Sequence, residues 1–131
     1  MSAPKPLICV VDDEEPVRRT LCASLEAAGF ATLQAANGIE ALDALSRADV
    51  AVVVLDIVLP EKEGLSTIVD IKGRMPSMPI LAISGGGMGD AYEYLRYARE
   101  LGADDVLAKP FRNEDLVERV KRLAKGGAAR S

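Results

Sequence analysis

A single carboxylate, Asp56, interrupts a run of aliphatic residues in the stretch VVVLDIVLP, residues 52–60. An aspartate inside a protein core costs several kcal/mol unless a partner pairs with it or neutralises it. Asp56 therefore lies either at the surface, just beyond the end of a strand, or in a site whose charges compensate it. The other residues that could do chemistry decide between these two interpretations.

Three more short apolar runs end in charged or polar residues. LICVV (7–11) leads into Asp12-Asp13-Glu14-Glu15, PILAI (79–83) into Ser84, and DVLA (105–108) into Lys109-Pro110. If these ends meet, three carboxylates, a hydroxyl and an ammonium share one small site. Crowded carboxylates repel one another, which raises their pKa values unless a cation joins them.

A hard divalent cation fits this set of side chains. Mg²⁺ prefers oxygen ligands in octahedral geometry and keeps several waters, and Mn²⁺ is an alternative ion. Asp12, Asp13 and Asp56 supply a partial shell, which the backbone carbonyl of Val58 would complete. Lys109 would balance the remaining negative charge, so Asp56 would be tolerated because a metal ion and a lysine compensate it.

Such a site suits phosphoryl transfer. A carboxylate beside Mg²⁺ can act as a nucleophile toward phosphorus and form an aspartyl phosphate. The reaction needs positioning and neutralisation of the phosphoryl oxygens more than an acid or base, and the metal ion, Lys109 and Ser84 could each take one oxygen. The chain contains no histidine, which excludes a histidine-based triad and a zinc-histidine site.

The elements that must position these residues alternate along the chain. Strands are predicted at 7–11, 31–35, 51–55, 79–83 and 105–108. Helices are predicted from about Pro16 to Gly29, after Asn37-Gly38 with Ile39, Leu42 and Leu45, around Leu65, Ile68, Val69 and Ile71, up to about Leu101, and from the N-cap Asn113 to about Lys125. This alternation predicts an α/β fold with a five-stranded parallel sheet between two helix layers, joined by right-handed crossovers. Ligands in such folds gather beyond the carboxyl ends of the strands, where all the candidate residues fall.

Composition narrows the function classes. The 131 residues suffice for one domain, 1–131, with a core over about 6–125 and GGAARS (126–131) as a flexible tail or the start of a linker. A net charge of −4 argues against nucleic-acid binding. No apolar run approaches a membrane span and no signal-peptide layout is present, so a cytoplasmic protein is expected. Cys9 and Cys22 lack metal-site spacing and are expected to be reduced core thiols.

Over about residues 6–125, the chain resembles the receiver domain of bacterial two-component response regulators. The resemblance rests on characteristic residues in the order Asp12-Asp13, Asp56, Ser84 and Lys109-Pro110. The resemblance implies a flavodoxin-like, chemotaxis-regulator-like fold with strand order 2-1-3-4-5. It implies that Asp56 accepts a phosphoryl group, that Asp12 and Asp13 hold Mg²⁺, Asp13 by direct ligation, and that Lys109 and Ser84 are the signature lysine and the switch residue. The Lys109-Pro110 bond is typically cis in that family.

The same resemblance implies a signalling role with protein partners. The phosphoryl donor would be a histidine kinase or a histidine phosphotransfer protein, and the output a downstream protein or an effector domain, with a homodimer possible. No effector domain follows Lys125, so a stand-alone regulator and a receiver cut from a longer chain both fit. Apart from its own phosphotransfer and slow autodephosphorylation, the chain is not expected to be an enzyme.

Two segments depart from the family pattern. Val106 stands where the family usually has Tyr or Phe, whose ring turns inward on phosphorylation. The valine therefore argues against a switch of that kind in this chain. The glycine-rich loop SGGGMGD is expected to move, and Met88, Tyr92, Tyr94 and Tyr97 are candidates for a partner face, while Leu95 is expected in the core. Val58 and Gly86 have no side chain that could orient a water toward the phosphoryl group, which predicts a long-lived phosphoaspartate.

The sequence leaves three alternatives to the receiver. A Mg²⁺-dependent phosphatase of the haloacid dehalogenase type needs a second Asp two residues after its nucleophile, where this chain has Val58. A nucleotide-binding module lacks its glycine patterns, because GGGMG follows the fourth strand and not the first. A pseudo-receiver scaffold that is never phosphorylated is the third alternative, and the full set of acids argues against it.

Overall fold

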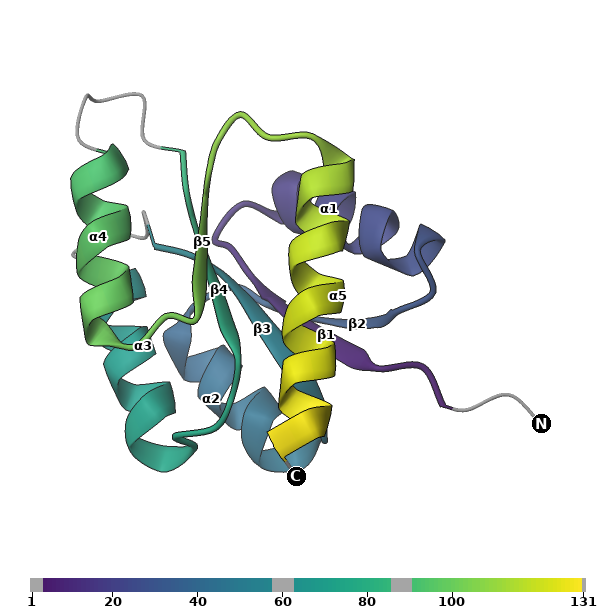
Figure 1. Ribbon diagram of the computed structural model, residues 1–131, viewed down its shortest axis with the longest axis horizontal. Helices are drawn as coiled ribbons and strands as arrows, with labels where there is room; N and C mark the ends of the chain where they lie inside the picture. The colour runs from purple at the N-terminus through teal and green to yellow at the C-terminus, as the bar shows by residue number, and fades with distance from the viewer. Residues whose placement is uncertain (1–3, 58–62, 86–90, 131) are drawn as a thin grey trace.

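The apolar runs form the strands of one sheet that has helices on both faces (Figure 1); the computed structural model describes residues 4–57, 63–85 and 91–130. The strands are β1 (Leu7–Val11), β2 (Ala31–Ala35), β3 (Val50–Asp56), β4 (Ile80–Ser84) and β5 (Asp105–Ala108). The helices are α1 (Glu15–Ala27), α2 (Gly38–Arg47), α3 (Glu63–Arg74), α4 (Ala91–Leu101) and α5 (Asn113–Arg130). Strands and helices alternate as predicted.

The five described strands are all parallel and lie in the order β2-β1-β3-β4-β5. This confirms the predicted flavodoxin-like, doubly wound sheet. The chain moves outward from β1 to β2 and then returns past β1 to β3, so the strand order reverses between β1 and β3. Ligands of open α/β sheets bind at such a reversal, beyond the carboxyl ends of the strands.

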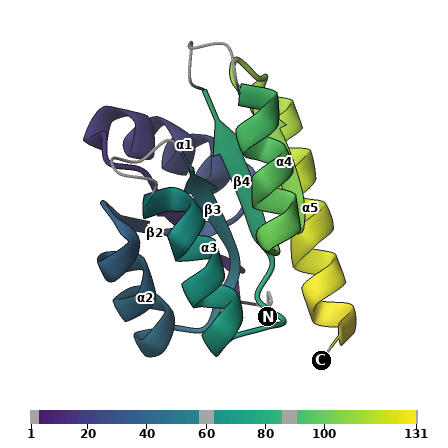
Figure 2. The ribbon, with the colours of Figure 1, turned by 90° about the vertical axis from the view of Figure 1, so that its left-hand side faces the viewer.

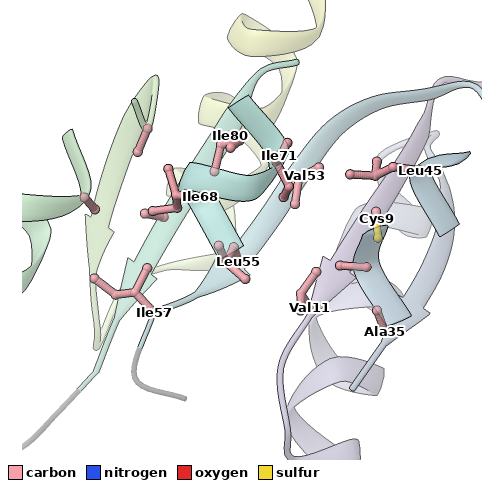
Figure 3. Close-up of a cluster of buried hydrophobic side chains, with 14 of the residues drawn as sticks. Cys9, Val11, Ala35, Leu45, Val53, Leu55, Ile57, Ile68, Ile71 and Ile80 are labelled. Atoms are coloured by element: carbon pink, nitrogen blue, oxygen red, sulfur yellow. The ribbon is translucent and has the colours of Figure 1, made fainter. Parts of the chain in front are cut away.

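Helices α2, α3 and α4 cover one face of the sheet, and α1 and α5 cover the other (Figures 1 and 2). Each face has its own apolar cluster. Figure 3 shows the cluster beneath α2, α3 and α4, to which β1 contributes Cys9 and Val11, while Ile8 and Val10 point to the opposite cluster. Because both faces are buried, the central strands are nearly continuous aliphatic runs.

Two strand ends differ from the prediction. Strand β3 ends at Asp56 and β4 at Ser84, so both residues close their strands instead of following them. The reason is pairing, since Asp56 lies opposite Ile83 and Ser84 opposite Ala108 in the sheet. The backbones of both residues are therefore fixed by the sheet itself.

Some helix details also differ. Ile39 is 80% exposed, because it lies about 200° around α2 from the buried Ala41. Val69 is likewise exposed, one residue off the buried face of α3. Asn113 is the first residue of α5 and not its cap, and the backbone N–H of Arg112 donates to Asp115 instead.

Helix α5 continues to Arg130, past its expected end near Lys125, so residues 126–130 are helical. The glycines there weaken a helix by about 1 kcal/mol each, but Ala128, Ala129 and Arg130 favour it.

No helix within the described ranges is long and apolar enough to cross a membrane. Cys9 and Cys22 are buried free thiols in separate clusters, as expected for core residues.

Candidate functional site

The register of the sheet brings the candidate residues to one edge. Val11 lies opposite Leu55, so Asp12, the next residue after β1, lies beside Asp56 at the end of β3. On the other side, Ser84 lies opposite Ala108, so Lys109 follows directly beside the end of β4. Four residues that are far apart in the sequence are thus gathered where the strand order reverses.

Asp56 is paired with a cation. Its side chain is 12% exposed, and its Oδ2 accepts a hydrogen bond from Nζ of Lys109 at 3.1 Å. The carboxylate is therefore neither buried alone nor fully solvated. Of the two interpretations raised by the aliphatic run, the structure supports the compensated site.

Asp12 is more deeply buried, with 2% of its side chain exposed. Its Oδ1 accepts a hydrogen bond from the backbone N–H of Glu14 at 2.8 Å, and its Oδ2 lies 3.9 Å from Nζ of Lys109. Burial raises the pKa of Asp12 to about 6; the neighbouring Asp56 adds to the rise, while the Glu14 N–H and Lys109 oppose it. At neutral pH this carboxylate is held close to a second one in a poorly solvated place.

Lys109 reaches the acids through a gap that only glycine leaves open. A Cβ at Gly85 would lie 2.3 Å from Cδ of Lys109. The backbone N–H of Lys109 donates to the carbonyl oxygen of Ser84 at 2.9 Å, which fixes the start of the lysine against β4. The Lys109-Pro110 bond is cis, as the family resemblance predicted.

Two buried polar atoms of the site have no hydrogen-bond partner among the described residues. They are Oδ2 of Asp12 and Oγ of the fully buried Ser84. Buried polar atoms are nearly always paired, so two orphans at one sheet edge suggest a missing ligand. A cation near the carboxylate and an anionic oxygen near the hydroxyl would satisfy them.

The predicted metal ligands are only partly assembled. Asp12 and Asp56 are neighbours, whereas Asp13 is exposed on the turn after β1. Within the described ranges no three Asp, Glu, Cys or His side chains are clustered closely enough to hold a metal ion. Val58, whose carbonyl was expected to join them, lies outside the described residues, as does Gly86. The orphaned oxygen of Asp12 beside a second carboxylate nevertheless fits a hard divalent cation.

Two close backbone approaches go beyond what the sequence predicts. The glycines after Ser84 predict a loop that moves, and the structure adds that Gly85 makes room for Lys109. Similarly, a Cβ at Gly64 would lie 2.4 Å from Cα of Ile57, so α3 begins directly against the residue after Asp56. The sequence holds no signal for either approach, because both depend on which segments lie opposite each other.

The candidate partner face on α4 is partly described. Tyr94 and Tyr97 are 39% and 42% exposed, and Leu95 is buried as expected. Met88 and the side chain of Tyr92 lie outside the described residues. Val106 is half-buried and lines a cavity of about 380 Å³ together with Leu95, Arg96, Arg99, Leu107, Ala108 and Arg119.

Comparisons with known proteins agree with this geometry. The family model of the response regulator receiver domain matches residues 8–121. A putative NtrX-like response regulator of Rickettsia felis is 42% identical over 117 residues, which cover 88% of this chain and 24% of the relative. The response regulator MprA of Mycobacterium tuberculosis is 34% identical over 116 residues, covering 88% of this chain and 49% of the relative.

Among solved structures, the receiver domain of NtrX from Brucella abortus has a TM-score of 0.83 and 32% identity, covering 90% of this chain and 98% of that chain. The chain spans about a quarter of the length of the NtrX-like relatives that it matches.

Proposed function

The chain belongs to the response regulator receiver domain family of two-component systems, and from this premise we propose that it accepts a phosphoryl group on Asp56. The donor is a histidine kinase or a histidine phosphotransfer protein, and the reaction depends on Mg²⁺. The chain acts in the cytoplasm as a signalling domain of this family and not as a classical enzyme. Its output passes to a protein partner, to an effector domain or to a second copy of the chain.

The observation that carries this proposal is the pairing at the sheet edge. Lys109 lies 3.1 Å from Asp56, and beside it Oδ2 of Asp12 and Oγ of Ser84 are buried without hydrogen-bond partners among the described residues. A phosphoryl group on Asp56 brings three oxygens that need charge and hydrogen bonds. Lys109 and Ser84 can provide both.

The transfer step follows from these residues. A carboxylate oxygen of Asp56 forms the new bond to phosphorus, and the bond from phosphorus to the donor nitrogen breaks, with its electron pair staying on that nitrogen. The attacking group is the carboxylate of Asp56, whose Oδ2 lies 3.1 Å from Nζ of Lys109. Lys109 then stabilises one phosphoryl oxygen and Ser84 donates its hydroxyl hydrogen to another.

Asp12, Asp13, Asp56 and the carbonyl of Val58 would hold the metal ion. When bound, Mg²⁺ supplies positive charge that offsets the crowded carboxylates and the phosphoryl oxygens. Before it binds, Lys109 is the cation that both Asp12 and Asp56 approach.

Switching would use the same contacts. When Lys109 and Ser84 turn to the phosphoryl oxygens, the contact from Lys109 to Asp56 is exchanged, and the backbone joining β4 to β5 at these residues responds. Val106 has no ring to rotate, so output rests on this backbone movement and on the face that carries Tyr94 and Tyr97. The apolar Val58 and the side-chain-free Gly86 give a phosphoaspartate that persists longer than seconds.

The proposal is tested by phosphorylation without a kinase. The purified chain is incubated with acetyl phosphate and Mg²⁺, and the intact mass is measured for the wild type, Asp56→Asn and the exposed control Asp49→Asn. One phosphoryl mass is expected on the wild type and the control, and none on Asp56→Asn or in EDTA. No gain on the wild type would leave a pseudo-receiver scaffold, and a gain that survives in Asp56→Asn would place the acceptor elsewhere.

A further inference from the structure

Asp12 is held at nearly every polar atom. Its backbone N–H donates to the carbonyl of Ala35 at 3.1 Å, its Oδ1 accepts from the N–H of Glu14 at 2.8 Å, and its carbonyl oxygen accepts from Nη1 of Arg18 at 2.8 Å. Only Oδ2 is left without a hydrogen-bond partner among the described residues. That oxygen is the one that approaches Lys109, on the side of Asp56. Three hydrogen bonds therefore hold Asp12 so that its Oδ2 points toward Lys109 and Asp56.

The hydrogen bond to the carbonyl oxygen of Asp12 comes from a helix, through the side chain of Arg18. Arg18 lies in the first turns of α1, is half-buried, and donates through Nε to Oε1 of Gln34 on β2 at 3.1 Å. One side chain thus ties the residue after β1 to both α1 and β2. A guanidinium suits this task because its donors lie in one rigid plane, so a bond at Nε restricts the direction of Nη1.

We propose that Arg18 is a positioning residue for the cation site: by holding the carbonyl of Asp12, with Gln34 orienting its guanidinium, it keeps Oδ2 of Asp12 directed at the metal ion. This inference rests on the proposed function, because it assumes that Asp12 belongs to a Mg²⁺ site. It assigns Arg18 no contact with the metal ion or with phosphorus. It also gives a role to a positive charge beside a site that must attract a cation.

That charge makes the inference testable by the sign of an effect. If Arg18 acted only through its charge, removing it would lessen repulsion and Mg²⁺ would bind more tightly. If Arg18 positions Asp12, removing it frees the turn and Mg²⁺ binds more weakly. Residues that orient metal ligands typically contribute about 10-fold to 100-fold in affinity, which exceeds the opposing effect of one partly solvated charge.

The experiment measures the dissociation constant for Mg²⁺ by calorimetry, without phosphodonor, on protein first stripped with EDTA. The variants are Arg18→Met and the control Arg19→Met. In the wild type, the side chain of Arg19 is 72% exposed and forms an ion pair with Glu15 at 3.6 Å. We expect Arg18→Met to bind Mg²⁺ roughly tenfold more weakly. Arg19→Met, which removes the same charge one residue away, should bind it equally well or slightly more tightly.

Gln34→Leu provides a second, neutral variant that removes one contact of Arg18 without a change of charge. It should weaken Mg²⁺ binding less than Arg18→Met, and it should have no further effect in the Arg18→Met background. At saturating Mg²⁺, the rate of phosphorylation by acetyl phosphate should be close to that of the wild type in every variant, because a positioning residue acts on the affinity for the ion. Circular dichroism in EDTA checks that each variant is folded.

Unchanged or tighter Mg²⁺ binding by a folded Arg18→Met overturns the inference, and so does an equal loss in Arg19→Met. If Arg18→Met does not fold, Gln34→Leu decides, and wild-type affinity in that variant overturns the inference. A wild type that binds no Mg²⁺ overturns the proposed metal site as well. The two failures are distinguishable, because the wild type is measured first and alone.

Discussion

The ammonium of Lys109 lies 3.1 Å from Oδ2 of Asp56 and 3.9 Å from Oδ2 of Asp12, so one cation contacts a carboxylate at the end of β3 and another directly after β1. Neither acid has more than 12% of its side chain exposed. In such a place charge interactions are less screened than at the surface. Changes at Lys109, Asp12 and the glycine beside them should therefore have large effects of predictable sign.

Lys109→Met removes that cation. Mg²⁺ should bind more tightly, because a competing positive charge is lost, while phosphorylation by acetyl phosphate at saturating Mg²⁺ should slow by roughly 100-fold for want of a donor to the phosphoryl oxygens. Calorimetry and intact mass against time measure the two effects. Lys121→Met, at an exposed position on α5, should change neither. A Lys109→Met protein that is phosphorylated at the wild-type rate would refute the role given to this lysine.

Asp12→Asn should stabilise the metal-free protein at neutral pH. Burial raises the pKa of Asp12 from 3.8 to about 6, so the folded state binds a proton more tightly than the unfolded state does. The associated stability is present below about pH 4 and is lost as the pH rises through 6, by at most about 3 kcal/mol. Asparagine does not titrate, so the difference between variant and wild type isolates this group from all others.

Urea unfolding in EDTA, followed by circular dichroism, should give the variant an advantage at pH 7.5 that disappears near pH 4. Mg²⁺ should reverse the order, because it stabilises only a chain that can bind it. A variant that is less stable than the wild type at pH 7.5 in EDTA would mean that Asp12 is not an unfavourable buried acid.

Much of the fold could be predicted because its signals are local. Short aliphatic runs that alternate with helical patterns predict a parallel sheet, and the placement of acids, Ser84 and Lys109 at run ends predicts one site. The strand register could not be predicted, because periodicity along one strand says nothing of which residue lies opposite. That register is what makes Asp56 and Ser84 the last residues of their strands.

The close contacts were also beyond the sequence. The gap at Gly85 and the bond from Arg18 to the carbonyl of Asp12 depend on distances between segments far apart or on backbone direction. Ile39 was grouped with its helix's apolar residues although its angle around α2 points it to solvent. Residue type and order along the chain therefore predicted that Asp12, Asp56, Ser84 and Lys109 lie close together, but not the residues that hold them in place.

The two thiols should react slowly while the protein is folded. Burial raises the pKa of Cys9 to about 12 and, to a smaller extent, that of Cys22. Because the thiolate is the reactive form, both should resist a thiol reagent such as Ellman's reagent at pH 8 and react fully in urea. Counting released thionitrobenzoate checks this, with Cys9→Ala assigning the signal. Rapid reaction of one thiol in the folded wild type would show that its segment opens readily.

Gly85→Ala should disturb the site through Lys109 alone. The φ angle of Gly85 lies outside the left-handed region, so alanine is strained there only by its Cβ, which would lie 2.3 Å from Cδ of Lys109. The lysine must move, which should slow phosphorylation and lower the free energy of unfolding by about 1 kcal/mol. Gly73→Ala is the matched control, since a Cβ there meets nothing within 4 Å, and in a helix it should stabilise by up to about 1 kcal/mol.

The route of the effect can be established with a double variant. If Gly85→Ala acts by displacing the ammonium of Lys109, its penalty on the phosphorylation rate should vanish in the Lys109→Met background, which has no ammonium to displace. Additive losses would show instead that the methyl group disturbs the backbone after Ser84, and with it the hydroxyl that faces the phosphoryl group. Rates at saturating Mg²⁺ for the four proteins separate these cases, because the metal ion is then bound in all of them.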